Sequence, residues 1–229
     1  MNLEIASTKY SIFGDYSFLK AETENISKLF GFLGQDGFLP NMLQMIQIDQ
    51  LQRKTGTVYR PQFVNSNTNC VISFLPERID YETTTYDKKN IDTFCSYISQ
   101  IQALFDIKIS RIALTSNINN QITKALFETI RSKNIVSGSY PYSDNLIELD
   151  YRVVSRQDCF EIAEKVNVGQ HIQAVLNQEN AALLHIDTDI NTLGENKENR
   201  FDSNSCVKFF NNATAWNDQI IKQFGDSLQ

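Results

Sequence analysis

The sequence is poor in cysteine, histidine, proline and glycine. Its 229 residues hold four cysteines, two histidines, four prolines and nine glycines. The cysteines are scattered without a C-x-x-C pair, which excludes a zinc-type spacing and favours buried reduced thiols over a disulfide framework. No G-x-S-x-G elbow surrounds a serine, and the glycines of residues 31–37 follow a predicted helix, where glycine ends helices. We therefore predict no cofactor, no metal and no nucleotide.

Long hydrophobic runs and an excess of positive charge are also missing. No stretch reaches the eighteen or so apolar residues of a membrane span, and residues 1–6 lack the charged start and apolar stretch of a signal peptide. We expect a cytoplasmic protein without membrane contact. The formal net charge of −6 disfavours broad attraction to nucleic acid or anionic lipid. Few prolines with abundant Asn, Ile, Lys and Tyr are typical of a low-GC bacterial or phage source.

One pattern of predicted elements, β-α-β-β-β-β-α, occurs twice, in residues 1–106 and in residues 107–229. Period-two and period-3.6 spacing of the apolar residues assign strands and helices. In the first half we predict strands at 3–13, 42–52, 59–65, 69–75 and 79–85, and helices at 17–33 and 90–105. In the second we predict strands at 107–116, 146–154, 159–168, 171–176 and 181–190, and helices at 119–132 and from 203 or 205 to 224.

This order predicts an α+β fold with antiparallel sheets that helices cover on one face. Two halves of one topology usually pack about a pseudo-two-fold axis, so we expect one compact unit. The order resembles the duplicated fold of TATA-binding proteins, whose halves form a curved sheet with helices on its convex side. That resemblance is one of topology and implies no shared sequence.

A second resemblance rests on letters in the middle third of the chain. Arg60-Pro61-Gln62-Phe63, Asn69 to Phe74 and Pro76-Glu77-Arg78-Ile79-Asp80 form a strand pattern that precedes a helix and the strand Ser110-Arg111-Ile112-Ala113-Leu114. The pattern resembles a sporadically distributed family of uncharacterised prokaryotic proteins of similar size. It implies an α+β bacterial protein and no particular activity.

The strongest candidate for chemistry is His185-Ile186-Asp187-Thr188-Asp189. On a strand, His185, Asp187 and Asp189 point to one face and could ligate a metal, with Ile186 and Ile190 facing the core. Three ligands on one strand splay apart, so a fourth from Glu148, Asp150 or His171 would be needed. The alternative is that these residues are the polar side of a half-exposed strand.

Two further groups are candidate contacts. Cations interleaved with aromatic residues could bind nucleic acid, namely Arg53, Lys54, Tyr59 and Arg60 beside Phe63, together with Arg111 and Arg152. Tyr140 and Tyr142 could contact a protein, since tyrosine supplies a large contact area at small entropic cost. The alternatives are that the arginines pair with nearby carboxylates and that the tyrosines cover the sheet.

The sequence therefore favours a non-enzymatic protein of bacterial or phage origin that takes part in protein interaction or assembly through a sheet face or loop surface, as part of an oligomer or complex. The second hypothesis is a nucleic-acid-binding saddle. The third is a metal-dependent hydrolase centred on His185, Asp187 and Asp189. The unpaired backbone groups at the sheet edges are expected sites of contact with another chain.

Overall fold

The computed structural model describes residues 3–48, 54–84, 87–134, 146–177 and 181–228. In this part the protein is α+β, as predicted, with one large open antiparallel sheet and four α-helices. The sheet has nine strands in the order β2-β3-β4-β5-β1-β6-β9-β8-β7. The strands are β1 (Ser7–Phe13), β2 (Leu39–Ile48), β3 (Lys54–Asn65), β4 (Cys70–Phe74), β5 (Arg78–Thr83), β6 (Arg111–Thr123), β7 (Glu148–Cys159), β8 (Glu164–Leu176) and β9 (Ala181–Thr192).

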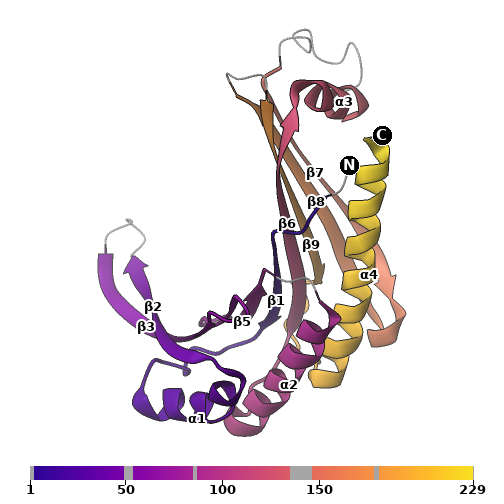
Figure 1. Ribbon diagram of the computed structural model, residues 1–229. Coiled ribbons are helices and arrows are strands. Elements are labelled where there is room, and N and C mark those ends of the chain that lie inside the picture. Colours follow the sequence, from indigo (N-terminus) through magenta and orange to yellow (C-terminus); the bar gives the residue numbers. More distant parts are fainter. Residues whose placement is uncertain (1–2, 49–53, 85–86, 135–145, 178–180, 229) are drawn as a thin grey trace.

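The helices cover one side of this sheet. They are α1 (Thr23–Leu33), α2 (Lys88–Phe105), α3 (Lys124–Asn134) and α4 (Ser203–Ser227). The sheet curves strongly, with α1, α2 and α4 on its convex side and α3 at the far end of β6, while its concave side is open (Figure 1). None of the helices in the described ranges is long and apolar enough to cross a membrane.

Two clusters of buried side chains hold the helices to the sheet. In the larger one, Tyr10 of β1 meets Phe210 of α4 edge to face at 5.2 Å, and Phe94 of α2 lies 5.9 Å from the same ring. In the smaller one, Ile118 and Ile186 pack with Phe127 of α3 and Phe224 of α4. Alternate residues of the strands enter these clusters, because every second side chain of a strand points toward the helices.

The two predicted halves share one continuous sheet. β1 belongs to residues 1–106 and β6 to residues 107–229, and these strands pair antiparallel from Ser7↔Asn117 to Phe13↔Arg111. The outer strands follow on either side, with β5 next to β1 and β9 next to β6. The side chains of both parts therefore lie on the same two faces.

The strand count in the second half differs from our prediction. Among the described residues three strands follow α3, where we predicted four. The predicted break at 169–170 is part of β8, where Gly169 pairs with Val154 on one side and Asp189 on the other. The glycine and polar residues there are typical of a turn, but hydrogen bonding to strands on both sides keeps the backbone extended.

The predicted helix at 119–132 was also placed too early. β6 continues to Thr123, and α3 begins at Lys124. Ile118 and Ile122 are both buried, and their spacing of four fits a helix as well as a strand. The polar residues between them lie in a strand because β9 supplies the pairing partner, from Ile118↔Ile186 to Thr123↔Ala181. This pairing is tertiary and leaves no local signal.

Candidate binding face

The open face of β7, β8 and β9 gathers the polar residues that the sequence singled out. Ile186 and Ile190 are buried toward the helices, so His185, Asp187 and Asp189 lie on the opposite, open face, as predicted. Cross-strand pairing then decides their neighbours: His171 stands opposite Asp187, and Gln173 stands opposite His185. Residues from three strands therefore form one cluster.

A chain of hydrogen bonds runs through this cluster. His171 Nε2 lies 2.6 Å from Asp150 Oδ1, and Gln173 donates to Asp150 Oδ2 at 2.9 Å. His185 Nε2 lies 2.9 Å from Asp187 Oδ2, which is also 3.9 Å from Nδ1 of His171. Asp187 thus stands between the two histidines, and each histidine contacts a carboxylate.

The far side of His185 shows what the network can do chemically. Its Nδ1 contacts the side-chain oxygen of Asn119, so both ring nitrogens face oxygen acceptors. Among the described residues neither histidine bonds to a serine or a cysteine, so the arrangement supplies polar and ionic contacts and no nucleophile with its base.

A small pocket opens beside the network. It has a volume of about 240 Å³, and the lining includes Arg152, Gly169, His171, Asp187 and Asp189. A methyl group on Gly169 would lie 3.2 Å from the backbone oxygen of Asp189, so the missing side chain leaves the hollow open. The pocket is therefore a small recess in the floor of the open face.

The charges around the pocket are predominantly acidic. Arg152, whose side chain is 62% exposed, reaches Asp189 only at 3.8 Å, a loose and solvent-screened pair. Hydrogen bonds from Gln173 and His171 lower the pKa of Asp150 below its usual value, which keeps that carboxylate ionised. An incoming cation or hydrogen-bond donor would find acceptors here.

The geometry does not favour the candidate metal site at His185, Asp187 and Asp189. In the described ranges no set of three or more His, Cys, Asp or Glu side chains is arranged to hold a metal ion. His185 and Asp187 are already hydrogen-bonded to each other, and Asp189 accepts instead from Asn191 at 2.9 Å. Side chains on the same face of one strand diverge. Those on the adjacent strands are hydrogen-bonded to one another and are not arranged around a common centre.

Arg60, a predicted nucleic-acid contact, has a structural position. Its side chain is buried, and its Nη1 donates to the backbone oxygens of Ser17 and Leu19 at 2.9 and 3.1 Å. These oxygens belong to the segment between β1 and α1. In this conformation the guanidinium holds that segment against β3 and does not face solvent.

The other predicted contacts are spread across the sheet. Arg111 lies over the ring of Phe13, with 4.6 Å between the guanidinium carbon and the ring centroid, at the centre of the sheet. Arg152 lies on β7 at one edge, and Tyr59 is exposed on β3 near the other edge. Arg53, Tyr140 and Tyr142 fall outside the described residues, as does the side chain of Lys54.

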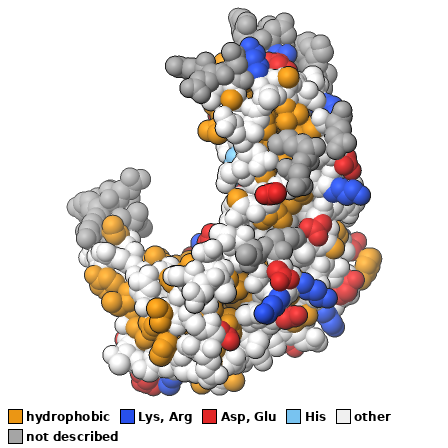
Figure 2. All heavy atoms as spheres, in the orientation of Figure 1, with side chains coloured by type: hydrophobic (Ala, Val, Ile, Leu, Met, Phe, Trp, Pro, Cys, Tyr) orange, Lys and Arg blue, Asp and Glu red, His pale blue; other side chains and the backbone are white. Residues whose placement is uncertain are grey.

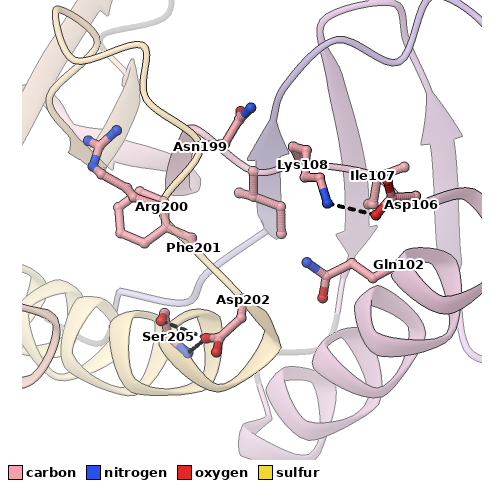
Figure 3. Close-up of a pocket in the computed structure, with 10 residues that line it drawn as sticks. Gln102, Asp106, Ile107, Lys108, Asn199, Arg200, Phe201, Asp202 and Ser205 are labelled. Carbon is pink, nitrogen blue, oxygen red and sulfur yellow. Dashed lines mark hydrogen bonds and ion pairs between the residues drawn. The ribbon is translucent and has the colours of Figure 1, made fainter.

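A second pocket lies between the helices. It has a volume of about 380 Å³ where the end of α2 meets the start of α4 (Figure 3). Its charged groups have partners: Lys108 pairs with Asp106 at 2.6 Å, and Asp202 accepts from Ser205. Arg200 binds Glu164 at 2.6 Å. These contacts serve the packing of the helix ends.

Sequence reasoning named His171 and Asp150 only as optional additions and did not find Asn119, Gln173 or Gly169. The signal for Gln173 was its period-two spacing from His171, which places both on one face of a strand. Asn119 had no signal, because its segment was predicted to be helical. No protein-family model matches this chain, and no curated protein is significantly similar to it.

Proposed function

We propose that the protein is a non-enzymatic binding protein whose concave sheet face receives a protein partner. The observation that carries this proposal is the one-sided cover of the sheet: α1, α2 and α4 bury the convex face, while the concave face remains open (Figure 1), with polar side chains such as His171, Asp187 and Asp189 on β8 and β9. A sheet of nine strands needs only one buried face, so the second is available for recognition.

The chemistry of this face suits a protein more than a nucleic acid. By strand register its described positions carry seven carboxylates and seven basic residues, of which Arg60 is buried: Asp80, Glu82, Glu148, Asp150, Asp158, Asp187 and Asp189 against Lys9, Arg60, Arg78, Arg111, Arg152, Arg156 and Lys165. A backbone of phosphates requires a clear excess of cations. Amides, imidazoles and carboxylates together match the mixed donors and acceptors of a polypeptide.

We further propose that the fold is a duplication about a pseudo-two-fold axis between β1 and β6. Each of these strands leads into a helix, then into antiparallel strands whose last member returns beside it, and then into a long helix. Such a relation would give the partner two related half-sites. It supports a saddle-like mode of binding without deciding what is bound.

Site-specific photo-crosslinking tests the binding proposal. A photoreactive amino acid replaces Thr115 or Gln173 on the open face, and in the control it replaces Gln223, which is exposed on α4. After irradiation in the native host, we expect one defined protein adduct from the open-face positions and none from the control. Adducts of equal yield from both faces, or none from the open face, would refute the proposal.

A nucleic-acid-binding saddle is the second candidate. The curvature of the sheet, with helices only on the outside, is the observation that favours it. Binding to labelled duplex DNA and to single-stranded RNA is measured as salt concentration rises. Affinity that falls steeply with salt and depends on Arg152 supports this candidate, whereas no binding at low salt excludes it.

A further inference from the structure

The outer edge of β2 is long, uncharged and apolar. β2 is the terminal strand of the sheet, and none of its ten residues is charged. The side chains of Met42 and Ile46 are 58% and 59% exposed, and Leu39 is exposed as well. Hydrophobic side chains gather over the β2–β3 arm (Figure 2). An exposed, apolar edge strand of this length is a pairing surface.

The opposite edge of the same sheet is protected. β7 has five charged residues among its twelve: Glu148, Asp150, Arg152, Arg156 and Asp158. Charged side chains along an edge discourage pairing with another chain. Of the two edges, β2 is therefore the one better suited to pairing with another chain.

The backbone of β2 shows which residues would bond that occupant. Pro40 and Pro61 lack an N–H, and they occupy the pairs Pro40↔Phe63 and Met42↔Pro61, so these are pairs without hydrogen bonds across β2 and β3. The pair Gln44↔Tyr59 lies two residues farther along β2, so it is also a pair without hydrogen bonds between these strands. The Tyr59 carbonyl accepts from Ala21 N at 3.2 Å and so points away from β2. Hence Met42, Gln44 and Ile46 direct their backbone groups outward.

The sequence of β2 is symmetric about Gln44. Two apolar residues, Met42 and Leu43, precede it, and two more, Met45 and Ile46, follow. If a second β2 pairs antiparallel with Gln44 opposite Gln44, then Met42 meets the second copy's Ile46 and Leu43 meets its Met45. Between Met42 and Ile46 every apolar side chain then faces an apolar one, and no charges oppose each other.

We propose that β2 binds the β2 strand of a second copy of this chain, antiparallel about a two-fold axis at Gln44. The outward backbone groups of Met42, Gln44 and Ile46 complete the ladder, and Pro40 ends it because it has no N–H to donate. The two nine-stranded sheets become one. Such an isologous contact closes as a dimer and leaves no further free β2 edge.

The two-fold axis at Gln44 gives a charge-reversal test. Gln44 is exposed in the single chain, so its replacement leaves the fold intact. We measure the mass of the full chain by light scattering during gel filtration over a range of concentrations. The wild type is expected at twice 26.2 kDa. Gln44→Lys and Gln44→Glu each place like charges across the axis and should each weaken the dimer at least about tenfold.

Mixing the two variants should restore the dimer, because Lys then faces Glu. Gln157→Lys and Gln157→Glu on the β7 edge are the matched controls, and both should remain dimeric. A wild type that is monomeric at every concentration, or Gln44 variants that stay dimeric or fail to recover on mixing, would overturn the proposal. A different protein bound along β2 would overturn it too. The dimer does not depend on what the concave face binds. A negative crosslinking result would therefore refute the binding proposal and not the dimer, whereas a monomeric mass would refute the dimer and not the binding proposal.

Discussion

Arg60 on β3 donates a hydrogen bond from Nη1 to the backbone oxygen of Leu19, 3.1 Å away and 41 residues earlier in the chain. The same nitrogen lies 2.9 Å from the oxygen of Ser17, and the side chain is only 5% exposed. The carbonyl groups of an irregular segment need donors when they are buried. Arg60 supplies them and so connects β3 to the segment between β1 and α1.

Replacing this arginine should destabilise the fold. Arg60→Leu removes a charged donor from buried carbonyl oxygens, and we expect a loss of about 2–3 kcal/mol in the free energy of unfolding. Urea denaturation followed by circular dichroism measures it. Arg156→Leu, an exposed change on β7, serves as the control and should stay within about 0.5 kcal/mol. Equal losses in the two variants would show that Arg60 does not hold the segment.

Arg60 also shows where sequence reasoning reached its limit. In the sequence it is a cation among aromatic residues, which is a common feature of nucleic-acid contacts. Its partners are backbone atoms about forty residues away, and only the folded chain brings them together. The first half of the fold was predictable because strands such as β4 bury alternate residues and are bounded by short turns, and both features leave a local pattern in the sequence.

The candidate face was partly predictable for the same reason. Period-two spacing placed His185, Asp187 and Asp189 together, and the structure agrees. It could not show that His171 stands opposite Asp187, because register depends on the pairing of β8 with β9. Likewise, the β6 segment around Asn119 is a strand because β9 pairs with it.

The cap of α4 should contribute a pH-dependent part of the stability. Asp202 accepts from the backbone nitrogen and the hydroxyl of Ser205 at 2.7 and 2.6 Å, and these bonds lower the pKa of its carboxyl below 3.8. A lowered pKa in the folded state stabilises the fold above pH 3.8, and the effect is lost as the pH falls through the folded-state value.

Asp202→Ala should therefore cost about 1 kcal/mol at pH 7, as is usual for loss of an N-cap. Chemical denaturation of the variant and the wild type at several pH values measures the difference between them. That difference should shrink as the pH falls below 3.8. A difference that stays constant down to pH 2 would mean that the ionised carboxylate is not what stabilises the helix.

The four cysteines should be unreactive in the native protein. All four are buried, and burial raises the pKa of Cys95 to about 12 and that of Cys159 to about 11. The thiolate is the reactive form, so little of it is present at neutral pH. Mass spectrometry after iodoacetamide treatment should show no alkylation until denaturant is added, and then four additions. Rapid alkylation of native Cys159 would contradict its burial near the end of β7.

Two glycines should respond in opposite directions to the same substitution. Gly31 lies in α1, and a methyl group there would meet nothing within 4 Å, so Gly31→Ala should stabilise the protein by about 0.5–1 kcal/mol through helix propensity.

At Gly169 the added methyl group would lie 3.2 Å from the backbone oxygen of Asp189 and 3.6 Å from Cγ2 of Val154. That oxygen belongs to β9, which has paired strands on both sides and little freedom to move. We expect Gly169→Ala to lower stability by about 1 kcal/mol, since overpacking in a rigid site is costly. Urea midpoints of the two variants compare the changes directly. If Gly169→Ala were stabilising, the space at Gly169 would be large enough for a methyl group. The close approach of β8 and β9 would then not determine the shape of the pocket beside His171.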